Sequence, residues 1–176
     1  MPSRIGRVPV DRATFRELAG SFPSGVAIVT TVDEQGAPRG LTTQAFIALS
    51  TEPPLVLVSL DRSSRTLAAL RTCGRFAVNV LKGGSEELST RFATKADDKF
   101  EGVHWVPSAV APGIPILVDA VTAFLECTVA EVIEQGDHVV FVGSVDGGRV
   151  TGGPPLLYYR RTYAAWPEET PGPASL

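Results

Sequence analysis

Three clusters of hydroxyl, amide and guanidinium side chains each follow a run of apolar residues in this chain. They are Thr42, Thr43 and Gln44; Ser59 with Ser63, Ser64, Arg65 and Thr66; and Asn79 with Ser89 and Arg91. Arginine and hydroxyl groups at the start of a helix suit a phosphate, because the helix N-terminus adds free N–H groups and positive potential. Helix capping or solvation explains each cluster alone, but three in one chain favour a ligand with a phosphate and a ring system.

Side chains that perform hydrolysis or hold metals are scarce in the sequence. It has no Gly-x-Ser-x-Gly elbow, no His-Glu-x-x-His motif, no Walker loop and no dinucleotide glycine fingerprint. The two histidines and two cysteines have no metal-site spacing. His138 begins a predicted strand, where it can reach a ligand at a barrel rim, whereas His104 is expected to be an ordinary loop residue. This indicates either a pure binding protein or an enzyme whose cofactor does the chemistry.

Length and charge narrow the class of protein. The 176 residues, 44% hydrophobic and 20% charged, suit one globular domain with its own core. The net charge of -3, with no dense basic run, argues against nucleic-acid binding. The N-terminus lacks the apolar core of a signal peptide, and no apolar run reaches membrane-spanning length. We therefore expect a cytoplasmic protein with no membrane or nucleic-acid partner and with Cys73 and Cys127 reduced.

The elements that must position these side chains are mostly short strands. Strands are predicted at 26–32, 55–60, 76–81, 121–133, 138–145 and 156–163, with the chain from Arg39 returning antiparallel to the first. Helices are predicted at 11–18, from a cap at Ser63 or Ser64 to Cys73, and at 86–92, with a turn of helix at 97–100. Residues 103–115 are expected to form a surface loop and 146–148 a turn.

Many strands at hairpin spacing indicate a mainly β fold, an antiparallel barrel with a few short helices. We expect one domain at 11–166, between a flexible arm at 1–10 and a disordered tail at 167–176.

Several short segments carry a resemblance to a known family. They are residues 22–31, 40–46, Ser50 with 52–56, 76–81, 88–89 with 91–93, 98–100, 126–127, 136–138, Gly143 with Val145, 155–158 and Tyr163. With these segments in order through nearly the whole chain, the sequence resembles the short-chain flavin reductase family, the reductase components of two-component flavin monooxygenases. The resemblance implies a flavin-reductase-like split antiparallel β-barrel, the FMN-binding split barrel, and a homodimer with each site near the subunit interface.

The resemblance also implies roles for individual residues. The isoalloxazine ring is expected against Thr42, Thr43, Gln44 and Ala45. The ribityl chain and phosphate are expected at Ser59, Leu60, Ser64, Arg65 and Thr66. The ring edge and the rest of the flavin pocket are expected at Val78, Asn79, Val80, Ser89, Arg91 and Phe92. The nicotinamide nucleotide is expected at His138 and Tyr163, and no residue is expected to act as an acid, a base or a metal ligand.

The implied activity is an NAD(P)H:flavin oxidoreductase that hands diffusible reduced flavin to a partner monooxygenase. For hydride transfer the protein mainly has to position the two stacked rings. N–H donors near flavin N1 and O2 can stabilise the negative charge that develops there. FAD is favoured over FMN, because the loops are long enough to house an adenine, and NADH or NADPH is the reductant. The alternatives are a non-enzymatic flavin-binding split barrel, a pyridoxamine-phosphate-oxidase-like enzyme, and a nucleic-acid-binding barrel that the acidic balance disfavours.

Overall fold

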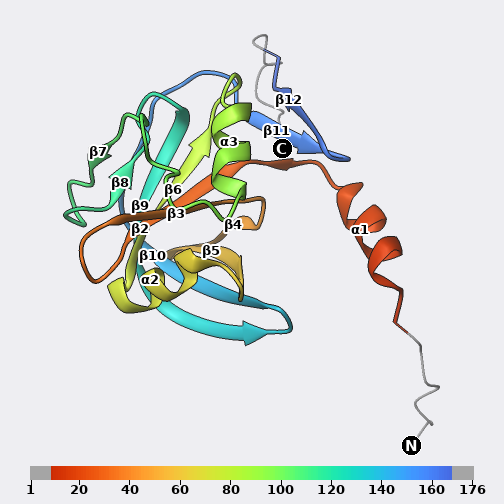
Figure 1. The fold of residues 1–176 in the computed structure, drawn as a ribbon, viewed down its shortest axis with the longest axis horizontal. Coiled ribbons are helices and arrows are strands. Elements are labelled where there is room, and N and C mark those ends of the chain that lie inside the picture. Colours follow the sequence, from red (N-terminus) through yellow and green to blue (C-terminus); the bar gives the residue numbers. More distant parts are fainter. Residues whose placement is uncertain (1–8, 168–176) are drawn as a thin grey trace, which may run out of the picture.

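A seven-stranded antiparallel sheet forms the body of the protein in the computed structural model, which describes residues 9–167 (Figure 1). Its strand order is β3-β2-β6-β9-β10-β5-β4. The strands are β2 (Ala27–Val32), β3 (Pro38–Thr43), β4 (Phe46–Thr51), β5 (Pro54–Asp61), β6 (Arg75–Leu81), β9 (Val121–Gln135) and β10 (His138–Val150). Each joins its neighbours through antiparallel ladders, as expected for a chain of hairpins.

The two edges of this sheet meet because consecutive strands occupy them. β3 and β4 are the opposite edge strands, yet only Gln44 and Ala45 separate them. The sheet must therefore curl until its two edges touch at Gln44 and Ala45, which form the β3–β4 crossing. Two hydrogen bonds hold the contact: Ser59 N donates to Ala45 O at 3.1 Å, and Thr43 Oγ1 donates to Ser59 O at 3.3 Å. The result is an open, split barrel, which confirms the predicted fold class.

Two helices pack against β2 and β3 and complete the core. In α2 (Arg65–Cys73), the Ser64 side chain accepts a hydrogen bond from Thr66 N at 3.2 Å and so caps the first turn. Leu67 and Leu70 of α2 enter the main core cluster with the strands. α3 (Glu86–Ala93) buries Phe92 completely in a second cluster.

The remaining elements lie beside the barrel. A small sheet joins β1 (Ser24–Gly25), β11 (Leu156–Tyr159) and β12 (Thr162–Ala165), and β7 (Val106–Pro107) pairs with β8 (Pro115–Ile116). Helix α1 (Arg12–Gly20) buries none of its residues and lies apart from the main sheet (Figure 1). Its end is linked to the β11–β12 turn by the Arg160 N–H, which donates to Gly20 O at 3.2 Å. No helix within residues 9–167 is both long enough and apolar enough to cross a bilayer.

The structure corrects several predicted boundaries. Residues 99–102 form a turn where one turn of helix was predicted at 97–100. β10 does not end at Val145, because a bulge near Gly147 absorbs the glycine pair and pairing with β9 continues to Val150. The predicted strand at 156–163 is a hairpin, turned by Arg160 and Arg161 with φ of 46° and 66°. The predicted loop at 103–115 contains β7.

The predicted arm and tail lie almost entirely outside the described residues. The structure describes Pro9 to Pro167, which include only the last two residues of the arm and the first residue of the tail. The other boundaries agree with the predictions to within a few residues, except at β10 and the C-terminal hairpin.

Candidate functional site

A cavity of about 550 Å³ lies where the sheet edges meet. It is bounded by β3, the β3–β4 crossing, the start of α2, the end of α3, residues 94–100, the start of β10 and the β11–β12 hairpin. Its volume is in the range of pockets that hold drug-sized ligands. Twelve of the predicted site residues line it: Thr42, Thr43, Gln44, Ala45, Ser59, Ser64, Arg65, Thr66, Ser89, Phe92, His138 and Tyr163.

The wall formed by β3 and the crossing is narrow and firmly held. Thr42 Oγ1 donates to Ser89 O at 2.6 Å, and Thr43 Oγ1 accepts from Ala45 N at 3.0 Å. These hydroxyls therefore fix the wall to α3 and to the crossing. A Cβ placed on Gly40 would lie 2.8 Å from Phe92 Cε1, so any side chain there would displace the Phe92 ring. Small residues and buried hydroxyls make this wall a surface of backbone against which a planar ring can lie.

The opposite end of the cavity is the first turn of α2. The Asp61 carboxylate accepts from Ser63 N at 2.7 Å, and hydrogen bonds from Ser63, followed by the positive potential of His138, lower the pKa of Asp61. Ser64, Arg65 and Thr66 of this turn line the cavity, so the positive end of the helix dipole lies beside it. This end of the cavity is therefore suited to an anionic group.

Side-chain charges reinforce that preference. Arg39, Arg65, Lys95 and Lys99 line the cavity against two carboxylates, Asp61 and Asp97. Asp97 pairs with Arg65 and lies 3.9 Å from Arg39, which also bonds Asp33 at 2.8 Å. The hydrogen bond from Arg65 is the largest cause of a lowered pKa of Asp97. Cations thus exceed anions in the wall, as a phosphate-bearing ligand requires.

Lys99 ties two sides of the cavity together. Its Nζ donates to Gly40 O at 3.1 Å and to Phe92 O at 3.0 Å, so it bridges β3 and the end of α3. Burial, followed by the charge of Arg65, lowers the pKa of Lys99, while Asp97 opposes that shift. Lys99 is therefore a fixed cation that also sets the width of the slot between β3 and α3.

The cavity lining includes the two residues predicted for the nicotinamide nucleotide, His138 and Tyr163. His138 Nδ1 lies 2.7 Å from Asp137 Oδ1, and the hydrogen bond with His138 is the main cause of a lowered pKa of Asp137. Across the cavity, the Tyr163 hydroxyl lies 3.0 Å from Ser89 Oγ, and its ring meets Tyr158 edge-on with centroids 5.0 Å apart. An imidazole and two phenol rings thus form part of the cavity lining.

The other predicted site residues lie outside the cavity. Leu60 and Val78 are fully buried in the main core cluster, and Val80 packs against it. Asn79 is also fully buried: its amide donates to Ile28 O at 3.1 Å and to Thr30 Oγ1 at 3.0 Å, and its Oδ1 accepts from Leu117 N at 2.8 Å. Its polar atoms therefore link β6 to β2 and to the segment before β9.

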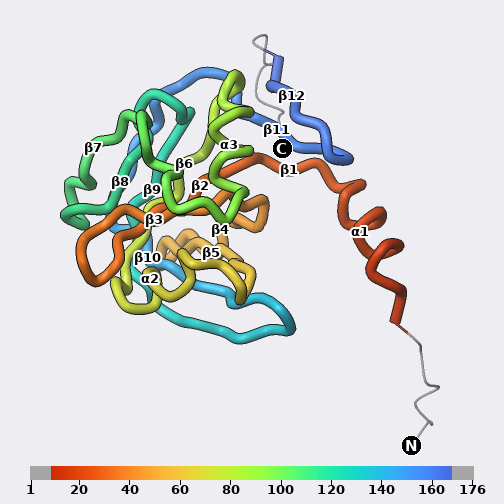
Figure 2. The backbone as a smooth tube through the Cα atoms, viewed as in Figure 1, coloured from red at the N-terminus to blue at the C-terminus, as the bar shows by residue number. Residues whose placement is uncertain are grey.

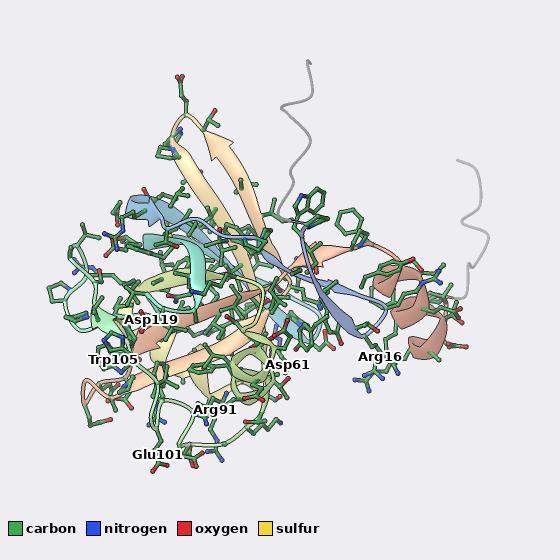
Figure 3. All side chains as sticks on the ribbon, turned by 90° about the horizontal axis from the view of Figure 1, so that it is seen from above. Arg16, Asp61, Arg91, Glu101, Trp105 and Asp119 are labelled. Atoms are coloured by element: carbon green, nitrogen blue, oxygen red, sulfur yellow. The ribbon has the colours of Figure 1, made fainter. Side chains whose placement is uncertain are left out.

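Arg91 also points away from the cavity. Its Nη1 donates to Glu101 O at 2.8 Å, and Figure 3 shows the two residues together at the outer edge of the molecule. The exposed guanidinium ties α3 to the following loop. In contrast, Arg39, Lys95, Asp97, Lys99, Phe100 and Tyr158 line the cavity without having been assigned to it from the sequence. The 98–100 and 155–158 segments of the family resemblance include three of them, Lys99, Phe100 and Tyr158, but no role was assigned to these residues.

The fold and the cavity together define a class: a split barrel whose cavity, between β3 and the start of α2, is suited to a planar anionic ligand. A family model described as the flavin reductase like domain matches residues 19–167, and the chain belongs to that family. It is therefore an NAD(P)H-dependent flavin reductase, as its sequence predicted.

Individual relatives support this assignment. The chain is similar to the flavin reductase (NADH) of Kitasatospora aureofaciens, with 47% identity over 95% of this chain and 88% of the relative. The crystal structure of nitrilotriacetate monooxygenase component B from Mycobacterium thermoresistibile is 41% identical and superposes with a TM-score of 0.87, covering 94% of this chain and 92% of that one. The NADH:FAD oxidoreductase SgcE6 of Streptomyces globisporus, in complex with NAD and FAD fragments, is 31% identical with a TM-score of 0.84, covering 94% and 100%.

Proposed function

We propose that the cavity binds FAD, with the isoalloxazine ring along the wall formed by β3 and the crossing and the phosphates at the start of α2. The observation that supports this most is the pairing of a flat backbone wall at Gly40–Ala45 with a cationic end at Arg65 in a single cavity. The polar groups of a flavin phosphate match that end, and a ring matches the wall. Bound flavin supplies the hydride-accepting chemistry.

The protein's own residues position the reactants. Thr42 and Thr43 hold the wall in place through their part-buried hydrogen bonds to Ser89 O and from Ala45 N. Phe92 and Phe100, whose rings meet edge-on with centroids 4.9 Å apart, help to keep water away from the slot. Because no proton transfer by a side chain is needed, catalysis here is positioning and electrostatic support.

The nicotinamide nucleotide is proposed at the rim. His138 and Tyr163 line the same cavity as the proposed ring site, so a nicotinamide bound beside them would lie close to the ring. NADH is favoured, because the Kitasatospora and Streptomyces relatives are named for it. A relative from Lentzea aerocolonigenes is named for NADPH, so NADPH is the alternative. FAD is favoured over FMN for the same reason, since the Streptomyces structure holds FAD fragments.

Delivery of reduced flavin to a monooxygenase completes the proposal. A relative from Mycobacterium tuberculosis, 40% identical, is named as the reductase subunit of a flavin-dependent monooxygenase. The four lysine and arginine side chains that line the cavity are all at least partly exposed. Weak, exposed phosphate contacts permit release of the product.

A homodimer is also proposed. Phe15, Leu18 and Phe22, in and just after α1, are 60%, 62% and 78% exposed, although their side chains are large and apolar. Ile47 and Leu49 of the edge strand β4 are exposed as well. Apolar groups this exposed, on a helix with no buried residue, are typical of a surface that a second subunit covers.

Steady-state measurements test the central proposal. The protein is mixed with NADH or NADPH and with FAD, FMN or riboflavin, and loss of the yellow flavin absorbance is followed under anaerobic conditions. Bleaching that is fastest with NADH and FAD is expected. If neither nicotinamide bleaches any flavin, the proposal is wrong; if FMN or riboflavin exceeds FAD, only the choice of flavin is wrong.

A further inference from the structure

Residues 94–98, part of the green tube that leaves α3 in Figure 2, lie in no helix or strand. Their side chains contact the first turn of α2. Lys95 Nζ donates to Ser63 Oγ at 3.3 Å, and the Asp97 carboxylate pairs with Nη1 of Arg65. All residues of this segment except Asp98 line the cavity. The segment therefore holds a carboxylate against the cations at this end of the cavity.

Arg65 differs from the neighbouring cations in having a partner that is easily exchanged. Arg39 donates to Asp33 through Nε at 3.0 Å and Nη2 at 2.8 Å, and Lys99 donates to two backbone carbonyls. Within residues 9–167, the hydrogen bond to Asp97 is the one that the Arg65 side chain makes. The two side chains of this pair are 60% and 71% exposed. Solvent screens such a pair, so a more highly charged anion can replace the carboxylate.

The Asp97 carboxylate remains charged while a ligand binds. The hydrogen bond and charge of Arg65, followed by the charges of Arg39 and Lys99, lower the pKa of Asp97, which is therefore ionised at neutral pH. A phosphate on the same guanidinium must either displace this carboxylate or lie close to it. Displacement breaks an ion pair, and proximity brings like charges together, so both weaken binding of the phosphate.

We propose that Asp97 competes with the flavin phosphate for Arg65 and thereby weakens flavin binding. The inference rests on the proposed function, because it requires the flavin phosphate at the start of α2. Asp97 acts through Arg65 and not on the flavin ring, so it affects only flavins that carry a phosphate. The pair between Asp97 and Arg65 forms again as reduced flavin leaves, which keeps the flavin exchangeable between this protein and a partner.

Binding of oxidised flavins to the full chain, without any reductant, tests this. Dissociation constants for FMN, FAD and riboflavin are measured by quenching of flavin fluorescence for the wild type, Asp97→Asn and Asp98→Asn. Asp97→Asn should lower the dissociation constants of FMN and FAD about fivefold, the size of one exposed ion pair, and leave that of riboflavin unchanged. Asp98→Asn makes the same change of charge at an exposed residue outside the cavity lining, and should change all three much less.

Other outcomes overturn the inference in distinct ways. Weaker binding of FMN to the Asp97 variant would mean that Asp97 orients Arg65 for the phosphate. Equal tightening by Asp98→Asn would assign the effect to net charge, and an equal effect on riboflavin would assign it to the ring site.

Two further results separate this inference from the proposed function. An unchanged FMN affinity in Asp97→Asn, together with a weakened one in Arg65→Ala, would refute the competition alone. Failure of the wild type to bind any flavin would refute the proposed function itself, and is recognised before the variants are compared.

Discussion

Within the cavity, individual polar side chains divide into those that hold the wall and those left for a ligand. Thr42 and Thr43 direct their hydroxyls to backbone groups, whereas Arg65 is paired only with the exposed Asp97. An exposed ion pair of this kind contributes little to folding, because solvent screens it. Arg65 can therefore exchange Asp97 for a ligand phosphate at small cost to the fold.

The first prediction concerns Arg65. Arg65→Ala should raise the flavin dissociation constant about tenfold, because a charge-assisted bond to the phosphate is lost. Arg91→Ala is the matched control, since Arg91 bonds Glu101 O outside the cavity and its loss should leave flavin binding unchanged. Isothermal titration with FMN and FAD measures both. A larger loss in the Arg91 variant would reverse the assignment of the two arginines.

The second prediction concerns His138 at the rim. His138→Ala should raise the KM for NADH about fivefold, as expected for one lost hydrogen bond, and change the flavin dissociation constant less. His104→Ala is the control, because His104 is paired with Asp119 away from the cavity. Stopped-flow kinetics and flavin titration separate the two constants. Equal loss of both would contradict a role confined to the nicotinamide.

Among the elements, those with local signals are predictable from the sequence and those set by distant contacts are not. α2 follows from its Ser64 cap and its apolar spacing, and β2 from its β-branched run. The turn at Arg160 and Arg161 has positive φ without glycine, so nothing local marks it. Asp97 reaches Arg65 across 32 residues of chain, a pairing that only the folded barrel creates. Asn79 looks like a ligand group in sequence, yet its three buried partners come from other segments.

A third prediction tests the packing between strands. A Cβ added at Gly143 in β10 would lie 2.5 Å from Phe76 Cζ and 3.1 Å from Cys127 Cβ, inside the core. Gly143→Ala should therefore lower the free energy of unfolding by about 1–3 kcal/mol, as overpacking does. Gly25→Ala, where nothing lies within 4 Å, is the control and should change it much less. Urea denaturation measures both, and equal stability of the two variants would mean that the core yields easily at this point.

For the molecule as a whole, the distribution of apolar surface separates the barrel from α1. The barrel buries most of its large apolar side chains, with Ile47 and Leu49 of β4 among the exceptions, while α1 presents Phe15 and Leu18 to solvent and is linked to the C-terminal hairpin by the Arg160 N–H (Figure 1). Burial of such a helix against a second copy would recover hydrophobic free energy that the single chain does not gain. The proposed dimer is therefore expected to depend on this helix.

The fourth prediction follows at this scale. Phe15→Ser combined with Leu18→Ser should convert a dimer into a monomer, because the apolar face of α1 is removed while the barrel core is untouched. Arg16→Ser, on the same helix and exposed in Figure 3, is the control and should remain a dimer. Light scattering coupled to size-exclusion chromatography gives the mass of each. A wild type that is already monomeric would refute the proposed dimer.

The two-residue crossing between β3 and β4 has a consequence for how this chain tolerates change in length. Gln44 and Ala45 both join the two edges of the barrel sheet and line the cavity. A residue inserted here would therefore weaken the contact between the sheet edges and change the shape of the cavity at the same time. Residues 94–105, which lie outside every strand, can lengthen or shorten without parting the sheet edges. Divergence in ligand preference is therefore expected to accumulate in that segment, while the crossing keeps its length.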